Sequence, residues 1–405
     1  MAEAKRGQVG FFARDRGQVP PVDRRSVIRM WLAVLAAAAT LASAGAGHGQ
    51  GLPKTFAWTA YGTTSSGYAV SVAIGNALAE EGYKLRVVPA KNDISRMIPL
   101  KAGRVQFSAM GIGSFLAQEG VLDFAAKRWG PQRVRVIMMS WANSNTGLPA
   151  TARDSAIETA ADLKGKRVAW VLGAPALNQN MTAWLAFGGT NWDEVDVVEV
   201  SGWRASIQGI IDGTIDAAIA STDSSMLFQL DGSPRGLRFF EAPTSDIEGW
   251  RRLLEFAPWY APHRATAGVG LSPDNPLDGA SYGYPILTSY AGQDPEMAYE
   301  LAKLLHTKFD AYKDSHSNAI GWAMDRQVFA WIVPYADGAV RYFKEIGVWN
   351  EEHEANNHAL IERQRVLAEA WARIEDAEED DEAHQALWLA ERKHALTGAG
   401  FDPVW

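Results

Sequence analysis

The chain has no cysteine among its 405 residues. This absence excludes disulfide bonds, zinc sites built on thiolates, a cysteine nucleophile and a lipid-modified cysteine anchor. The sequence also lacks the H-E-x-x-H pattern of zinc hydrolases and the Walker loop that binds nucleotide phosphates. We therefore expect no cofactor and no metal.

Long apolar runs and basic residues are also scarce. After residue 50, no segment is both charge-free and apolar over the roughly 20 residues that a membrane-spanning helix needs, so the mature chain is not expected to span a membrane. Residues 1–46 hold 7 of the 39 Lys and Arg and 3 of the 47 Asp and Glu, which leaves 32 basic and 44 acidic residues. An acidic surface repels phosphates, so no nucleic-acid partner is expected.

The N-terminus has the layout of an export signal. Arg24 and Arg25 form a twin-arginine pattern, residues 30–43 are uncharged and rich in alanine and leucine, and residues 42–46 offer small-residue cleavage motifs. We expect residues 1–46 to be a cleaved signal peptide rather than an anchor, because the apolar run is short and alanine-rich. The pattern leaves both the twin-arginine and the general secretion route open, and it predicts a periplasmic protein.

The mature chain repeats one local pattern. A short apolar run, a loop of small residues and a helical pattern follow one another at residues 55–78 and again at residues 167–187. Alternating strand and helix patterns continue after each, which predicts two α/β lobes with parallel or mixed sheets. Returning strands after residue 259 predict a hinge, and small ligands bind between such lobes where strands end.

The predicted boundaries follow from this rhythm. After residue 350 the sequence is charged, free of Gly and Pro to about residue 395, and helical in pattern. We assign the first lobe to residues 52–145 plus 265–345, the second lobe to residues 146–264, and a charged helical C-terminal extension to residues 350–405.

The order of four local patterns resembles the TAXI family of solute-binding subunits of TRAP (tripartite ATP-independent periplasmic) transporters. The resemblance covers roughly residues 54–345. The patterns are the strand-loop-helix of residues 59–78, KAGRVQFS at residues 101–108, DLKGKRV at residues 162–168 with the loop at residues 173–175, and IDGTIDAA at residues 211–218.

The resemblance implies a two-lobed, periplasmic-binding-protein-like (type II) clamshell with the C-terminal helical extension added to it. It implies a receptor that closes on a small, carboxylate-bearing metabolite and delivers it to TRAP membrane subunits for ion-gradient-driven uptake. The sequence departs from the family at Asp93 and Arg96, where serine and asparagine are commoner, at Gly113, and in a first loop that is poor in glycine. The family's usual amino-acid and dicarboxylate ligands therefore cannot be assumed, and the expectation stays at organic acid or amino acid binding.

The candidate ligand-binding residues lie at strand ends and helix starts. Hydroxyls and backbone N–H groups of the first loop can hold a carboxylate, and the helix N-terminus adds partial positive charge. Small residues in the second loop let a ligand approach the backbone. Arg96, Arg204 and Arg264 are candidate carboxylate partners, of which Arg204 has the best position. The predicted set is Tyr61, Thr63, Thr64, Ser65, Ser66, Gly111, Gly173, Ala174, Pro175, Ala176, Asn178, Trp203, Arg204, Ser221 and Thr222.

Two alternatives to a transport receptor stay open. One is an exported hydrolase that uses carboxylates in the cleft of the same scaffold, because paired carboxylates cannot be recognised from spacing alone. The other is a ligand-sensing subunit that docks on a membrane receptor. We expect no catalytic residue, and the face shared by Glu354 and His358 is more simply a charged surface than a metal site.

Overall fold

The computed structural model describes residues 51–377 and 380–404. The predicted signal peptide, residues 1–46, lies outside the described residues. None of the described helices combines the length and the apolar composition that crossing a lipid bilayer requires.

The first lobe, within the described residues, is built on a five-stranded mixed sheet. Its strands in spatial order are β2 (Lys84–Ala90), β1 (Thr55–Tyr61), β3 (Phe107–Met110), β12 (Ile286–Tyr290) and β4 (Val134–Met139). β1 pairs in parallel with β2 and β3, whereas β12 runs antiparallel to β3 and β4. Every residue of β3 and β4 is buried, as expected for strands that are covered on both faces.

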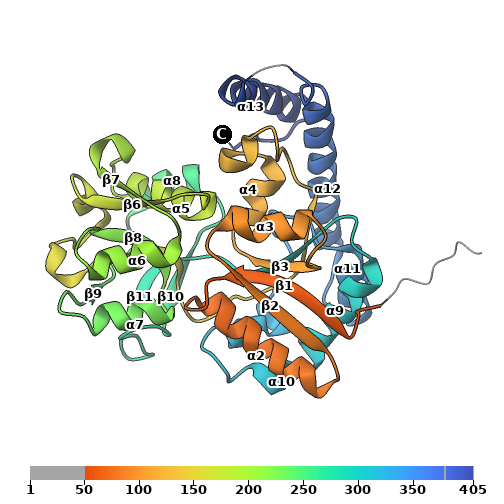
Figure 1. The fold of residues 1–405 in the computed structure, drawn as a ribbon, viewed down its shortest axis with the longest axis horizontal. Helices are drawn as coiled ribbons and strands as arrows, with labels where there is room; N and C mark the ends of the chain where they lie inside the picture. The colour runs from red at the N-terminus through yellow and green to blue at the C-terminus, as the bar shows by residue number, and fades with distance from the viewer. Residues whose placement is uncertain (1–50, 378–379, 405) are drawn as a thin grey trace, which may run out of the picture. The chain divides into compact units, whose positions relative to one another are not determined.

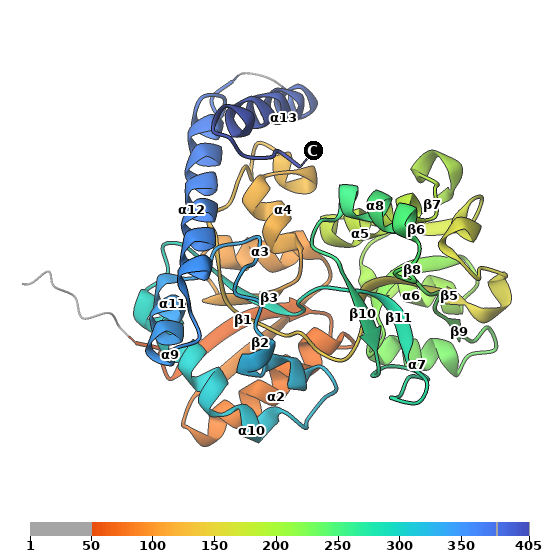
Figure 2. The same cartoon turned by 180° about the vertical axis from the view of Figure 1, so that it is seen from behind.

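Helices cover both faces of this sheet. They are α2 (Ser66–Glu80), α3 (Asp93–Lys101), α4 (Gly113–Glu119), α9 (Pro295–Thr307), α10 (Phe309–Tyr312) and α11 (Asp337–Glu345). Figures 1 and 2 show α2 and α9 on one face and α3 and α4 on the other. Ser65 begins α2 as an N-cap whose side chain accepts from the Tyr68 N–H, the capping role that serine favours.

The second lobe, which falls within the described ranges, has its own five-stranded sheet. Its strands in spatial order are β7 (Asp196–Val200), β6 (Arg167–Val171), β8 (Ala217–Ser221), β5 (Thr146–Ala152) and β9 (Leu237–Arg238). Its helices are α5 (Pro175–Phe187), α6 (Trp203–Ile211), α7 (Ser225–Asp231) and α8 (Ile247–Phe256). α5 packs on α8 and α6 packs on α7, and the figures place these two pairs on opposite faces.

Two segments connect the lobes. Residues 140–145 lead from β4 to β5, and residues 282–285 lead from β11 (Leu277–Ser281), which pairs with β10 (Ala261–Ala265), to β12. Single turns of tight helix occur at η1 (Leu122–Ala125), η2 (Arg153–Ser155), η3 (Ala160–Leu163), η4 (Trp192–Glu194), η5 (Ala319–Trp322) and η6 (Met324–Arg326).

The C-terminal extension consists of α12 (Glu351–Ala372) and α13 (Asp381–Gly398). Both helices lie beside α4 and η1 of the first lobe, with Trp388 Nε1 donating to the Gly120 carbonyl at 2.6 Å (Figures 1 and 2). A separate small core forms there from Leu367, Ala370, Trp388 and Leu396 with Ala125 of η1. The predicted fold class is confirmed in its architecture: two α/β lobes with a C-terminal helical extension. The residue boundaries assigned to the lobes stay predictions.

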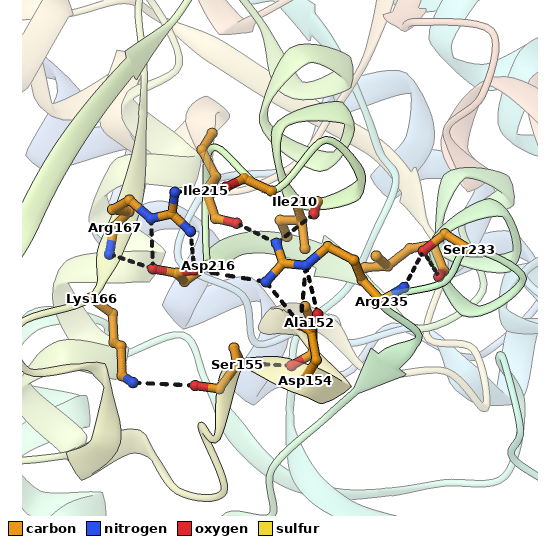
Figure 3. Close-up of polar contacts among 12 residues, drawn as sticks. Ala152, Asp154, Ser155, Lys166, Arg167, Ile210, Ile215, Asp216, Ser233 and Arg235 are labelled. Atoms are coloured by element: carbon orange, nitrogen blue, oxygen red, sulfur yellow. Dashed lines mark hydrogen bonds and ion pairs between the residues drawn. The ribbon is translucent and has the colours of Figure 1, made fainter.

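Two sequence patterns that carry the family resemblance meet at the base of the second lobe. Figure 3 shows Arg167, the first residue of β6, facing Asp216, which precedes β8. Arg167 donates from Nε and Nη2 to the two Asp216 oxygens at 3.0 and 2.6 Å, and from Nη1 to the Gly213 carbonyl at 2.6 Å. β6 and β8 run parallel, so this network lies at the opposite end of the strands from the Ser221 end. These motifs therefore stabilise the lobe rather than face a ligand.

Asp216→Ala is expected to lower the free energy of unfolding by about 1–2 kcal/mol, because Arg167 loses a bidentate partner but keeps contact with water. Burial raises the pKa of Asp216, and the hydrogen bonds from Arg167 more than offset it, so the pKa lies below its usual value. The stabilisation is thus present above the unfolded-state pKa and is lost as the pH falls through the lower folded-state pKa. Urea denaturation of both proteins at neutral and acid pH measures it; a loss that does not shrink in acid would contradict the ion-pair explanation.

Candidate functional site

A cavity that leaves about 40 Å³ for the centres of water-sized molecules lies between the two lobes. Most of its wall is aromatic or aliphatic, and hydroxyls and one guanidinium supply the polar groups, which is the usual make-up of a small-molecule site. The lining residues are Tyr61, Ser65, Arg96, Gly111, Thr146, Gly147, Ala176, Leu177, Trp203, Ile219, Ala220, Ser221, Ser224, Tyr282 and Tyr284.

A buried ion pair on α3 supplies the charge in this wall. Asn92 caps α3 in a reciprocal capping box with Ser95, which sets Asp93 at the first position and Arg96 one turn later. Both charged side chains are 0% exposed, and Arg96 Nη2 donates to Asp93 Oδ1. Arg96 Nη1 donates to the Ala109 carbonyl at 2.6 Å, whereas Nε has no partner. Arg96 Nε is therefore a buried donor without a protein acceptor, on a side chain that lines the cavity.

Asp93 also joins the two lobes. Its Oδ1 accepts from the Tyr61 hydroxyl at 3.2 Å, and its Oδ2 accepts from the Ala176 N–H at 3.0 Å, in the first turn of α5. A carboxylate at a helix N-terminus is favourable because it meets unpaired N–H groups and the positive end of the helix dipole. A side chain of the first lobe therefore occupies the helix start that we expected to face a ligand.

The loop before α5 contacts the first lobe through its backbone as well. Ile94 N–H donates to the Gly173 carbonyl at 3.1 Å, and Asn92 Nδ2 donates to the Leu172 carbonyl at 2.8 Å. Gly173 has a φ of +68°, and a Cβ on it would lie 2.7 Å from Asn92 Nδ2. Glycine is required here both for the backbone conformation and for the close approach of the lobes.

Ionisation in the cavity wall follows from burial. Burial raises the pKa of Tyr61 well above its usual value, and the negative charge of Asp93 raises it further. Burial lowers the pKa of Arg96, but Tyr61 and Asp93 more than offset this, so Arg96 stays charged. The Arg96 guanidinium lies over the Tyr61 ring at 3.6 Å from its centroid, an arrangement that stabilises the cation.

Two tyrosines from the returning segment complete the wall. The Tyr282 hydroxyl accepts from Asn180 Nδ2 at 2.8 Å, and burial raises its pKa above the usual value. Burial also raises the pKa of Tyr284 to about 12. Both phenols are therefore neutral at physiological pH and can donate a hydrogen bond.

The structure brings six of the fifteen predicted residues to the cavity: Tyr61, Ser65, Gly111, Ala176, Trp203 and Ser221. Thr63, Thr64 and Arg204 line a second, wider hollow on the outer side of Trp203. Arg204 is exposed there, so the arginine in the cavity is Arg96 instead. The remaining six line neither hollow: Ser66, Gly173, Ala174, Pro175, Asn178 and Thr222. Ligand binding by the predicted set stays a prediction.

Two of these six have local partners. The Asn178 amide donates to the Val171 carbonyl and accepts from the Val171 N–H, at 3.0 and 2.9 Å, so it holds α5 on β6. The Thr222 hydroxyl donates to the Ala267 carbonyl at 2.9 Å and accepts from the Asn145 N–H at 3.1 Å. Both side chains are therefore engaged within the protein.

Sequence reasoning missed Asp93, Tyr282 and Tyr284, and it ranked Arg96 below Arg204. The departure from the family at Asp93 and Arg96 was the available signal. Nothing in the local sequence marks Tyr282 and Tyr284, because they reach the cavity through the segment that returns to β12. The described residues hold no cluster of three or more His, Cys, Asp and Glu side chains that could bind a metal ion.

Asp223 is a second buried carboxylate near the junction of the lobes. Its Oδ2 accepts from the Ser317 hydroxyl at 3.1 Å, and its Oδ1 has no hydrogen-bond partner. Burial raises the pKa of Asp223, although the charge of His316 and nearby serine hydroxyls oppose the rise. The folded protein therefore holds this proton more tightly than the unfolded chain.

Asp223→Asn is expected to raise the thermal unfolding midpoint near neutral pH, because the amide removes a buried charge that its neighbours only partly compensate. Since the folded-state pKa is raised, the ionised carboxylate disfavours folding above that pKa, and its penalty disappears below the unfolded-state pKa of about 3.9. Scanning calorimetry from about pH 7.5 down to about pH 4 should show the gain shrinking. A gain that is constant over this range would show that the charge is not its cause.

Comparison with known proteins gives a family match and several similar solved structures. A family model described as the NMT1-like family matches residues 59–347. Among solved structures, the chain is similar to the alkanesulfonate-binding protein SsuA from Xanthomonas axonopodis pv. citri bound to MOPS, with 15% identity over 80% of this chain and 93% of that one and a TM-score of 0.41. It is also similar to the periplasmic aliphatic sulphonate binding protein SsuA from Escherichia coli, with 13% identity, 82% and 91% coverage and a TM-score of 0.41.

The L-cystine solute receptor of Neisseria gonorrhoeae, in its unliganded open conformation, gives 18% identity over 65% of this chain and 94% of that one, with a TM-score of 0.29. No curated protein sequence matches the chain. The family model spans well over half of the 405 residues and includes the elements that form the cavity. The chain therefore belongs to the NMT1-like family.

Proposed function

We propose that this protein is a periplasmic solute receptor that binds a small, carboxylate-bearing metabolite in the cavity between its lobes. The observation that carries the proposal is the Arg96 Nε donor, which is buried, unpaired and part of a mostly apolar wall drawn from both lobes. A buried donor without a partner costs free energy, and an acceptor oxygen of a ligand would remove that cost. Binding between lobes also links occupancy to closure, because a ligand stabilises the state in which both walls contact it.

We further propose delivery to the membrane subunits of a TRAP transporter. The TAXI-like order of patterns along residues 54–345 supports this assignment, and ion-gradient-driven uptake would then take place in the membrane partner. The export-signal pattern of residues 1–46 supports a periplasmic location.

The lining of the cavity favours a receptor over an exported hydrolase. Among the described residues that line it, none is His, Asp, Glu, Lys or Cys, so the lining itself offers no base to activate its serines. The sequence contains one G-x-S-x-G match, residues 279–283, but Ser281 lies within β11. The Ser281 hydroxyl accepts from the Thr146 N–H at 3.1 Å, whereas a hydrolase nucleophile needs an exposed strand-to-helix turn.

The test is a ligand screen on the mature chain, residues 47–405. Thermal-shift measurement with pools of monocarboxylates, dicarboxylates and amino acids should reveal a saturable rise in the unfolding midpoint, as binding to the folded state requires. Calorimetry then gives the affinity, and mass spectrometry should recover the ligand unchanged. A ligand that is consumed would favour the hydrolase, and no stabilisation by any carboxylate would contradict the proposal. Uptake by proteoliposomes that contain the membrane subunits tests the transport step.

A further inference from the structure

We infer that the cavity selects a monocarboxylate with an apolar body and no ammonium group. This inference rests on the proposed solute-binding function and narrows its ligand class. It rests on the donors and acceptors of the cavity wall that other protein groups do not already use. A buried site disfavours a ligand whose polar group finds no hydrogen-bond partner there.

The wall has no free carboxylate for an ammonium group. None of the described residues that line the cavity is acidic. Asp93, beside the lining residue Arg96, is neutralised by that guanidinium, and it also accepts from the Tyr61 hydroxyl and the Ala176 N–H. The buried carboxylate of Asp223 is not among the residues that line the cavity. An ammonium group that entered the cavity would be desolvated without a counter-charge, which is costly.

Several backbone carbonyls of the lining residues already accept hydrogen bonds from the protein, and one aromatic face is covered. The Gly147 carbonyl accepts from Trp184 Nε1 and the Tyr260 hydroxyl, and the Ile219 carbonyl accepts from Trp203 Nε1. The carbonyls of Gly111 and Tyr284 accept from Ser114 and Asn318. One face of the Tyr61 ring is covered by the Arg96 guanidinium, so that face is not open to a second cation.

The wall offers cationic support for one carboxylate. Arg96 is the one cation among the described lining residues, and two of its three nitrogens already donate to Asp93 and Ala109. The remaining Nε can donate to one carboxylate, with help from neutral tyrosine and serine hydroxyls. A second carboxylate in the cavity would have no cation of its own.

Apolar side chains make up much of the rest of the cavity wall. Leu177, Trp203 and Ile219 line the cavity together with the tyrosine rings, and they favour an aromatic or branched aliphatic body.

Two matched ligand series test the inference by isothermal titration calorimetry on the mature chain. The first is 3-phenylpropionate, phenylalanine and phenylsuccinate; the second is 4-methylpentanoate, leucine and isopropylsuccinate. Within each series the body is constant, and the second and third compounds add an ammonium group or a second carboxylate. We expect the monocarboxylate to bind at least tenfold more tightly than both relatives.

An amino acid or diacid that binds as tightly as its monocarboxylate would overturn the inference and leave the proposed receptor function standing. If none of the six compounds binds, the inference that the ligand is an apolar monocarboxylate is wrong. The wider pools of the ligand screen then decide whether the proposed receptor function is wrong as well.

Ser221→Asp provides the converse test, because it adds a carboxylate to the wall where Ser221 lines the cavity. We expect Ser221→Asp to reduce the ratio of the dissociation constants of phenylalanine and 3-phenylpropionate at least tenfold. Ser221→Asn introduces the neutral isostere of aspartate and should leave this ratio unchanged. Circular dichroism establishes that both variants are folded. A folded Ser221→Asp protein with the wild-type gap would overturn the argument that missing acceptors exclude ammonium.

Discussion

Arg96→Met is expected to weaken carboxylate binding roughly tenfold to a hundredfold, which is the value of a charge-assisted hydrogen bond. It is also expected to lower the free energy of unfolding by about 3–5 kcal/mol, because Asp93 would stay buried without its cation. Methionine fills a similar volume and keeps the helix, so the changes report on charge rather than on packing. Calorimetric titration and urea denaturation measure the two effects separately.

The double variant Asp93→Asn with Arg96→Met separates stability from binding. Removing both charges should recover most of the lost stability, since no buried charge is left unpaired, but it should not recover the affinity. Arg204→Ala is the matched control, because Arg204 is exposed and lines the outer hollow. Full affinity in a folded Arg96→Met protein would place the carboxylate site outside this cavity. Lost affinity in Arg204→Ala would instead restore Arg204 as its partner.

The local sequence predicted the parts of the fold that depend on local physics. The strand, small polar loop and helix of β1 and α2 are there, with Ser65 in the capping role that its residue type favours. The charged, Gly-free segment after residue 350 forms α12 and α13, because good helix formers without breakers continue a helix. Motif matches were less informative about the site, since the pair Arg167 and Asp216 stabilises the base of a lobe.

The cavity could not be predicted in the same way, because its chemistry depends on contacts between distant segments. Asp93 caps α5 across 83 residues, and Tyr282 meets Asn180 across 102. Helix-start residues such as Ala174 and Pro175 were expected to face a ligand, yet a side chain of the other lobe already satisfies an N–H group there. The sequence of a loop before a helix can indicate that it binds an anion. Only the tertiary structure shows whether that anion is a ligand or a carboxylate of the protein itself.

Glu119→Gln is expected to release the C-terminal extension from the first lobe. Glu119 is fully buried at the end of α4, where Arg363 donates to it from Nε and Nη2 at 2.8 and 2.7 Å and Arg392 donates from Nη2 at 2.5 Å. The two arginine side chains are only 8% and 1% exposed, so the amide leaves two buried cations without their carboxylate. The cost is about 3–5 kcal/mol, the range for breaking a buried ion pair. Hydrogen exchange should show faster exchange throughout α12 and α13, with the sheet of the second lobe unchanged.

The attachment of α12 and α13 is also expected to depend on pH, in a direction that the pKa of Glu119 determines. Burial raises the pKa of Glu119, but Arg363 and Arg392 more than offset it, so the pKa lies below its usual value. The attachment is therefore fully stabilised above the unfolded-state pKa, and it weakens as the pH falls through the lower folded-state pKa. In wild type, acid should speed exchange in α12 and α13, whereas in Glu119→Gln exchange should be fast at either pH. Glu362→Gln, which removes one of the two exposed partners of Arg365 on the same helix, is the control and should change little. Equal protection of the extension in Glu119→Gln and wild type would mean that the apolar contacts of Leu367, Trp388 and Leu396 hold it without the buried charges.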